Sequence, residues 1–138
     1  MAGRRGRTAL GGTVVLDADG VSKAAAADRL VHAMLLLARH RDARVVVSAV
    51  TLAEVLRGPR DAATYRVLTR IAELPVTSEV GRAAGALLGS TGLSGATVDA
   101  VVAATALRQT GPVLLVTSDP SDMAALTASR SDLAVAAV

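Results

Sequence analysis

Short, uninterrupted runs of apolar and β-branched residues recur along the chain, and they constrain its fold more than any other sequence feature. Four runs occupy residues 13–17, 44–48, 113–117 and 133–138, and residues 75–77 are expected to add a further short strand. Because the runs are continuously apolar rather than alternating, they are typical of strands buried on both faces. The sequence therefore predicts an α/β fold of the Rossmann-like kind, a parallel sheet of about five strands with helices on both faces.

The stretches between these strands repeat their apolar residues at helical spacing. We expect helices at residues 22–40, 51–57, 61–74, 79–88, 97–109 and 121–128. The second helix should end at Gly58 and Pro59, and the glycine-rich stretch 89–95 is predicted to be a loop. We expect one domain from residue 12 to residue 138, preceded by a basic, disordered segment at residues 1–11.

The composition excludes several classes of site. Tyr65 is the only aromatic residue and there is no cysteine, so the core must be built from close-packed Ala, Val and Leu. Aromatic platforms for RNA bases, thiolate nucleophiles and Cys-ligated zinc are excluded. The two histidines, His32 and His40, match no metal-binding motif. Any metal ion would therefore be held by oxygen atoms, which favours Mg²⁺ or Mn²⁺.

Charge and hydropathy bear on location and partners. The formal net charge is +3, and it comes from Arg4, Arg5 and Arg7, since the rest of the chain has as many basic as acidic residues. No apolar run reaches the roughly 18–20 residues of a membrane span, so we expect a cytoplasmic protein that does not bind membranes. The mean hydropathy of +0.46 indicates apolar surface that a partner or a second copy covers.

Four acidic residues lie where functional groups gather in an open α/β sheet, at or after the carboxyl ends of strands. Asp17 ends the first strand, Glu54 lies on the helix after the second, Asp99 opens the helix before the fourth, and Asp119 follows the fourth strand. Each has an alternative structural explanation: Asp17 could shape a turn, Asp119 could cap a helix, Asp99 could favour a helix N-terminus, and Glu54 could be a solvated surface residue. Glu54 and Asp99, however, lie in apolar stretches, where a carboxylate is costly without a partner.

Converging carboxylates repel one another, and a divalent cation removes that penalty. The cluster therefore predicts a metal ion, and an acidic metal pocket suits hydrolysis of phosphodiesters by a metal-activated water. Asp19 and Asp122 are second candidates beside Asp17 and Asp119. Arg57, Arg60 and Arg108 are candidates for weak contacts with an RNA backbone.

Four stretches that hold these acids, VVLDADGVS, VVVSAVTLAEVLRG, TVDAVVAATAL and VLLVTSDPSDM, resemble PIN-domain ribonucleases of the VapC toxin type. The resemblance implies an Mg²⁺- or Mn²⁺-dependent endoribonuclease and a cognate antitoxin that blocks its site. It also implies that Asp17, Asp99 and Asp119 bind the metal and act in catalysis together with Glu54. The stretch DADG departs from the D-T-N or D-x-S that is common in that family.

The same resemblance gives supporting roles to neighbouring residues and implies an oligomer. Thr117 and Ser118 would orient ligands or water, with Asp122 and Asp19 as auxiliary residues. A homodimer is expected, with the apolar helices predicted at residues 22–40 and 61–74 in its contact.

Two other interpretations stay open. The stretch VVLDADGV fits the D-x-D-G pattern of haloacid-dehalogenase-type phosphatases, with Asp17 as nucleophile and Asp19 as acid and base. That chemistry needs a Lys or Arg between its motifs to hold the phosphate, and the only lysine, Lys23, lies on the first predicted helix. The third interpretation is an inert α/β module that only binds a partner.

Overall fold

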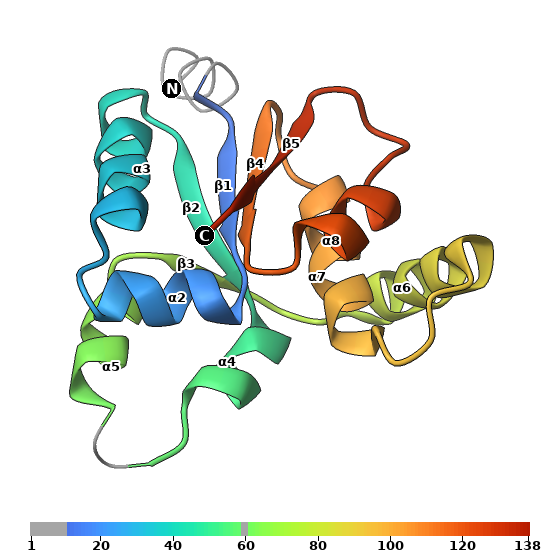
Figure 1. Cartoon of the computed structure of the whole chain (residues 1–138), viewed down its shortest axis with the longest axis horizontal. Helices are drawn as coiled ribbons and strands as arrows, with labels where there is room; N and C mark the ends of the chain where they lie inside the picture. The colour runs from blue at the N-terminus through green and yellow to red at the C-terminus, as the bar shows by residue number, and fades with distance from the viewer. Residues whose placement is uncertain (1–10, 59–60) are drawn as a thin grey trace.

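A parallel sheet with the strand order β3-β2-β1-β4-β5 forms the centre of the molecule (Figure 1). The computed structural model describes residues 11–58 and 61–138. All pairs of neighbouring strands are parallel. The strands are β1 Thr13–Leu16, β2 Arg44–Ser48, β3 Ala72–Leu74, β4 Val113–Thr117 and β5 Leu133–Ala137. This confirms the predicted sheet.

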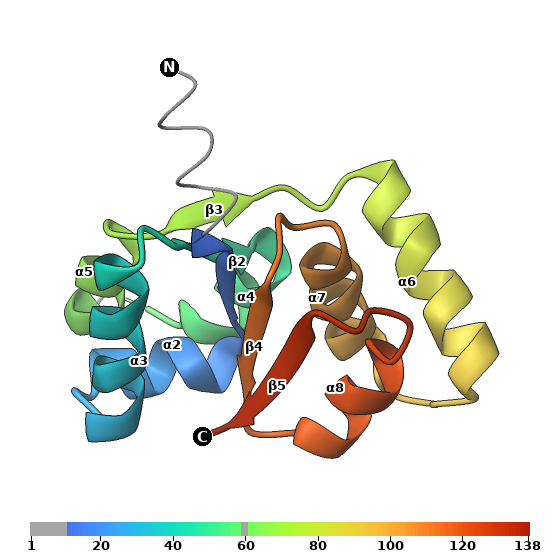
Figure 2. The same cartoon turned by 90° about the horizontal axis from the view of Figure 1, so that it is seen from above.

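Helices cover both faces of this sheet (Figure 2). The helices are α2 Ala18–Ala25, α3 Arg29–His40, α4 Ala49–Val55, α5 Ala62–Leu68, α6 Ser78–Thr91, α7 Thr97–Leu107 and α8 Pro120–Leu126. One core packs α2, α3 and α5 against the sheet, and the other packs α6, α7 and α8 against it. No helix in the described ranges is long and apolar enough to cross a membrane.

The strand order fixes where a site can form. The chain runs outward from β1 to β2 and β3, and then returns to the other side of β1 to form β4 and β5. The direction of winding thus reverses between β1 and β4. In open α/β sheets, ligands bind in the crevice at the carboxyl ends of the strands that flank such a reversal.

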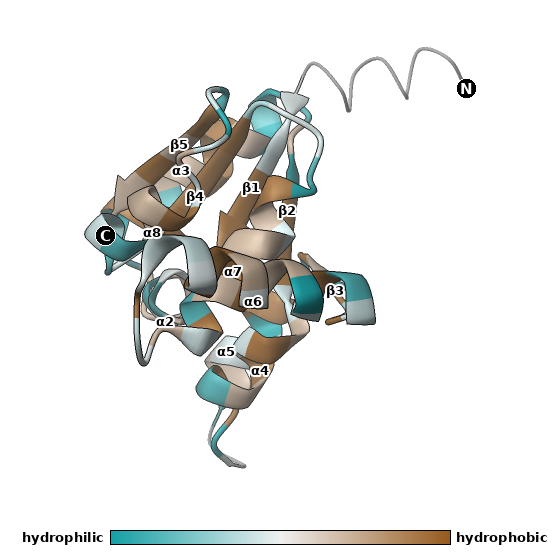
Figure 3. Cartoon of the chain, turned by 90° about the vertical axis from the view of Figure 1, so that its right-hand side faces the viewer, coloured by the Kyte–Doolittle hydropathy of each residue, from teal (hydrophilic) through white to brown (hydrophobic). Residues whose placement is uncertain are grey.

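Small side chains let α7 pack closely on the sheet. All residues from 100 to 106 of this helix are buried, and they are Ala, Val and Thr. The residues of β1, β2 and β4 that face this helix are also apolar (Figure 3). Because the helix is buried all round, the polar Asp99 in its first turn stands out.

The single helix predicted at residues 22–40 is wrong, because two helices occupy this stretch. The first begins at Ala18, since the Asp17 side chain accepts the Gly20 N–H and caps it. Ala27 then takes a left-handed φ of 57°, and the Asp28 side chain caps α3 by accepting the Val31 N–H at 3.1 Å. The run of alanines before Asp28 hid this break from a reading of periodicity.

The helix predicted at residues 61–74 and the strand predicted at 75–77 are also wrong. The helix ends at Leu68, and Ala72–Leu74 form β3 by pairing with Val46, Val47 and Ser48 of β2. Residues 75–77 lead instead into α6, whose N-cap is Thr77.

The predicted loop at residues 89–95 begins too early. α6 runs to Thr91 and ends at Gly92, whose φ of 69° is typical of a helix C-terminus. The predicted disordered segment at residues 1–11 lies outside the described residues except for Gly11. A Cβ at Gly11 would overlap the carbonyl oxygens of Arg41 and Asp42, so this residue is packed in place.

Arg130 holds the C-terminal end of α7. Its Nη1 donates to the carbonyls of Leu107 at 3.2 Å and Gln109 at 2.6 Å, and its Nε donates to Asp132 at 2.6 Å. Carbonyls at a helix end lack partners within the helix and favour a positive charge. We expect Arg130→Gln to lower the free energy of unfolding by about 1.5–3 kcal/mol, the usual contribution of hydrogen bonds to a charged group.

Urea denaturation measures this effect, and Arg108→Gln is the matched control. Arg108 pairs with Glu79 at 2.6 Å, but their side chains are 49% and 75% exposed. Exposed ion pairs contribute about 0–1 kcal/mol. Equal losses in the two variants would show that Arg130 does not hold the helix end.

Candidate functional site

Asp17 lies at the centre of the crevice, directly after β1. Its carboxylate accepts the Gly20 N–H at 2.9 Å, and it also receives hydrogen bonds from Thr117 and from the backbone of Ser118. The residue is only 9% exposed. Burial raises the pKa of Asp17 above its ordinary value, and these hydrogen bonds oppose the increase. Asp17 is therefore fixed in place by the ends of two neighbouring strands.

Asp99, Asp119 and Asp122 form the closest group of carboxylates in the described part of the chain. Each offers an oxygen atom within 4.8 Å of those of the other two. Asp99 comes from the first turn of α7, whereas Asp119 and Asp122 come from the start of α8. Two segments of the chain thus place three acids at one point beside β4.

The environment of Asp99 shows how these groups affect one another. Burial, together with the negative charges of Asp119, Asp17 and Asp122, raises the pKa of Asp99 to about 6. The proximity of the Asp119 carboxylate contributes to this increase in the pKa of Asp99. Asp17 is near enough for its charge to raise the pKa of Asp99, although it lies outside the close group of three aspartates.

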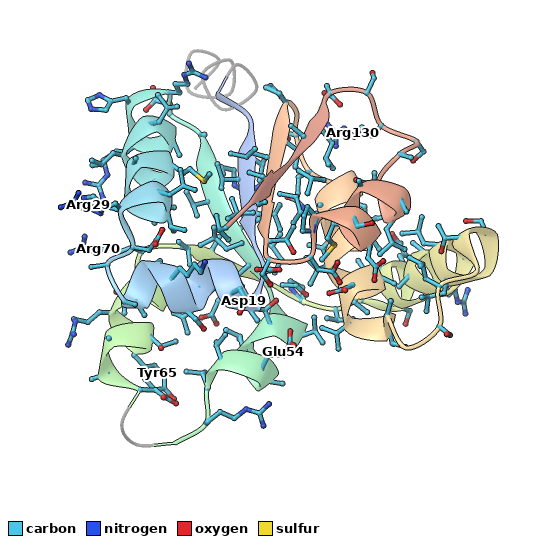
Figure 4. All side chains as sticks on the ribbon, in the orientation of Figure 1. Asp19, Arg29, Glu54, Tyr65, Arg70 and Arg130 are labelled. Carbon is cyan, nitrogen blue, oxygen red and sulfur yellow. The ribbon has the colours of Figure 1, made fainter. Side chains whose placement is uncertain are left out.

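Glu54 completes the site from the opposite side, at the end of α4. Figure 4 shows Glu54 and Asp19 near each other where α4 approaches the start of α2. Burial and the charges of Asp17 and Asp19 raise the pKa of Glu54, and the guanidinium of Arg57 opposes this increase. Glu54 lies outside the tight group of three aspartates, so the site has one closely packed side and one more open side.

The auxiliary residues named from the sequence also lie at this site. Thr117 is fully buried, and its Oγ1 accepts the Asp119 N–H at 3.0 Å. The Ser118 hydroxyl donates to the Asp19 carboxylate. These contacts tie the turn after β4 to the turn after β1.

The structure bears on whether these acids are merely structural. Among the described residues, neither Asp99 nor Asp119 caps its helix through its side chain, and the N-cap of α7 is Ala96. Asp119 does occupy the N-cap position of α8, with Pro120 directly after it, but its side chain makes no capping hydrogen bond. Asp17 does cap α2 through one carboxylate oxygen, and it also receives hydrogen bonds from the turn after β4.

The arginines considered for RNA contacts are not placed alike. Arg57 lies beside Glu54 and donates from Nε to its carbonyl at 3.2 Å. Arg108 follows the last residue of α7, about 14 Å along the helix from Asp99 at 1.5 Å per residue. Arg60 lies outside the described residues.

Sequence reasoning underrated Asp122, which we expected only to assist. Asp122 belongs to the close group of three aspartates, whereas Asp17 lies outside that group and affects it by raising the pKa of Asp99. A signal was present in the sequence, because Asp119 and Asp122 are three residues apart and therefore share one face of a helix.

The family model of the PIN domain matches residues 14–126 of the chain. The chain belongs to the PIN domain family. The match covers β1 to α8 and therefore every acid of the site. No curated protein matches the sequence significantly.

Solved structures share this PIN fold at low sequence identity. VapBC2 from Rickettsia felis, bound to a DNA fragment from the promoter, matches with a TM-score of 0.66, 17% identity and coverage of 91% of this chain and 98% of that chain. A toxin–antitoxin complex from Klebsiella pneumoniae matches with a TM-score of 0.66, 18% identity and coverage of 88% and 95%. VapBC-5 from Mycobacterium tuberculosis matches with a TM-score of 0.54, 24% identity and coverage of 91% and 98%.

The PIN-domain site makes the stability of the metal-free protein depend on pH. The pKa of Asp99 is raised from 3.8 to about 6, so the folded protein holds a proton that the unfolded chain releases. The free energy of unfolding should therefore fall as pH rises from about 4 to about 6, and Asp17 and Glu54 should add to this fall. Thermal unfolding across this pH window measures the effect.

Two further measurements test its cause. Asp99→Asn should flatten the decline, because the group that titrates is gone. Millimolar Mn²⁺ should raise the midpoint at neutral pH, because a ligand that binds only the folded state stabilises it. A midpoint that rises with pH in the metal-free protein would contradict the assigned electrostatics.

Proposed function

We propose that this PIN domain is a metal-dependent endoribonuclease and the toxin component of a toxin–antitoxin pair. The observation that carries the proposal is the convergence of Asp99, Asp119 and Asp122 on one point beside Asp17, at the reversal of the sheet. Membership of the PIN domain family supports a nuclease activity.

The residues of the site fit a hard divalent cation. All candidate ligands are carboxylate oxygens, which Mg²⁺ and Mn²⁺ prefer, and three of them lie within 4.8 Å of one another. The raised pKa of Asp99 reflects burial and, in addition, repulsion by neighbouring carboxylates, which a cation would offset. We propose that Asp17, Asp99 and Asp119 hold the ion. When bound, it would supply Lewis acidity toward the phosphate and lower the pKa of a water molecule.

The protein's own residues then orient the reactants. Thr117 and the Gly20 N–H fix one side of the Asp17 carboxylate, so that its free side faces the crevice. Glu54 lies on the open side with a raised pKa, where its carboxylate would orient the attacking water and accept a proton. Arg57, next to Glu54, would contact the RNA backbone.

RNA cleavage by the purified protein tests this function. We expect cleavage with Mn²⁺ or Mg²⁺ and none with EDTA, leaving 5′-phosphate and 3′-hydroxyl ends. Glu54→Gln should abolish it, whereas Asp42→Asn, a change of an acid on a turn remote from the crevice, should leave it intact. Products with 2′,3′-cyclic phosphate ends would contradict hydrolysis by an activated water.

The phosphatase alternative has little support in the site. Its Asp19 would have to act as acid and base, but Asp19 accepts a hydrogen bond from Ser118. It also gives no role to Glu54 and Asp99, which share the crevice with Asp17. The substitution Asp19→Asn distinguishes the two functions, because it should abolish a phosphatase and leave a nuclease active.

A groove on the face remote from the acids supports a protein partner. It lies between α3 and α5, has a volume of about 550 Å³ and has an apolar floor that includes Leu35 and Ile71. Arg39, Arg66 and Arg70 line it together with His32, and none of the described residues that line it is acidic. A second copy on a two-fold axis would bring these arginines together, so we propose that an acidic, amphipathic segment of an antitoxin occupies the groove.

An acidic amphipathic peptide is a direct probe for this groove. We expect it to bind the protein in fluorescence anisotropy, and we expect Arg66→Glu to weaken binding by about tenfold or more. Arg82→Glu, on the exposed side of α6, is the matched control. Equal binding of a basic version of the peptide would contradict the proposal.

A further inference from the structure

The Ser118 hydroxyl joins the two turns that carry the central acids of the site. It donates to the carboxylate of Asp19, a residue 99 positions away in the sequence. Asp19 lies two residues after Asp17, in the first turn of α2, and Ser118 directly precedes Asp119. The contact therefore spans the crevice between β1 and β4.

This contact is one of several hydrogen bonds between the segments that follow β1 and β4. The inner link is buried and runs through Thr117, whose side chain contacts the Asp17 carboxylate and accepts the Asp119 N–H at 3.0 Å. The outer link is the exposed pair of Ser118 and Asp19. The Asp119 side chain makes no capping bond to α8 within the described residues, so these links position its turn.

Neither member of the outer link is needed to satisfy a buried group, although Asp19 also has the favourable place of an acid in the first turn of α2. Both side chains are exposed. The carboxylate of Asp19 also adds repulsion to a site that already holds Asp17 and Glu54. Asp19 provides a hydrogen-bond acceptor for the Ser118 hydroxyl, and an uncharged acceptor at the same position would accept this hydrogen bond equally well.

We propose that Asp19 is a positioning residue of the cation site, which acts through Ser118 on the turn that carries Asp119. The proposal rests on the proposed function, since it assigns a role toward the same ion. It requires the acceptor oxygen of Asp19 and not its charge. Contacts that orient metal ligands typically change metal affinity by about 10–100-fold when they are removed.

Four variants of the full chain separate the hydrogen bond from the charge. Ser118→Ala and Asp19→Ala remove the link, whereas Ser118→Thr keeps the hydroxyl and Asp19→Asn keeps an acceptor oxygen. By calorimetry, we expect the first two to weaken Mn²⁺ binding about tenfold. The last two should bind Mn²⁺ within about twofold of the unmodified protein.

Two results would overturn the positioning role. One is unchanged Mn²⁺ affinity in Ser118→Ala. The other is an equal loss in Asp19→Asn and Asp19→Ala, which would make Asp19 a source of charge. In RNA cleavage, a positioning role predicts that excess Mn²⁺ restores the rate of Ser118→Ala, because only the occupancy of the site has changed.

A second readout separates this proposal from the function on which it rests. Hydrogen exchange of the Asp119 amide, which is bonded to Thr117, can be followed by NMR without any metal. Ser118→Ala and Asp19→Ala should speed it about tenfold, because the turn is held by one link fewer. If the unmodified protein binds no Mn²⁺, the proposed function fails, and unchanged exchange in both variants would refute the link by itself.

Discussion

Asp99→Asn should lower the rate of Mn²⁺-dependent RNA cleavage by about 100-fold or more, the scale seen when an active site loses one preorganised electrostatic group. Asp99 belongs to the group of three aspartates whose oxygen atoms lie within 4.8 Å of one another, and the charges of Asp119, Asp17 and Asp122 all raise its pKa in addition to burial. The amide of Asn keeps the size of the side chain but removes the negative charge that would hold the cation in the proposed site. Single-turnover cleavage at saturating Mn²⁺ measures the loss.

The fold of this variant is expected to survive, which makes the result interpretable. Without the repulsion that raises the pKa of Asp99, the metal-free variant should unfold at a higher temperature than the unmodified protein at neutral pH. Asp42→Asn again serves as the control acid. Cleavage at an unchanged rate by a folded Asp99→Asn protein would show that the group of Asp99, Asp119 and Asp122 does not take part in catalysis.

Leu115→Ala should lower the free energy of unfolding by about 2–5 kcal/mol, the range for truncating a buried leucine. Leu115 is 0% exposed, at the middle of β4, and it packs in the core formed with α6, α7 and α8. The chain has no Trp or Phe to fill the space left behind. Because domains of this kind are stable by about 5–15 kcal/mol, the loss is a large part of the total.

Urea denaturation of Leu115→Ala and Leu30→Ala side by side checks this value. Leu30 is 51% exposed on α3, so the same chemical change there should cost no more than about 0.5 kcal/mol. A loss below about 1 kcal/mol for Leu115→Ala would mean that the core on this face closes around the cavity.

The sequence was enough to predict four strands of the sheet but not β3. The interior strands β1, β2 and β4 coincide with apolar, β-branched runs, because a strand covered on both faces needs such residues at nearly every position. The partly buried edge strand β5 coincides with the apolar run at residues 133–138. β3 has the sequence AEL, which favours a helix by propensity. Only its pairing with Val46, Val47 and Ser48 makes it a strand, and pairing between distant segments leaves no local signal.

For the candidate site, the sequence indicated which acids to consider better than it indicated which of them lie closest together. Asp17 and Asp119 follow from the rule that strand ends carry function, and Asp99 from the cost of a carboxylate in an apolar helix. The close approach of Asp122 to Asp99 depends on how α7 and α8 pack, which no spacing reveals. The link from Ser118 to Asp19 spans the crevice and was hidden for the same reason.

The alanine-rich body of α7 has a consequence for how this protein tolerates change. Because residues 100–106 are all buried, the helix has no room to accept larger side chains along this stretch. Asp99 lies in the first turn of the same helix. A methyl group added at Ala103, far from any acid, would shift the helix as a rigid rod and carry that carboxylate with it. The spacing of the proposed metal ligands thus depends on small side chains of α7 that do not themselves contact the metal site.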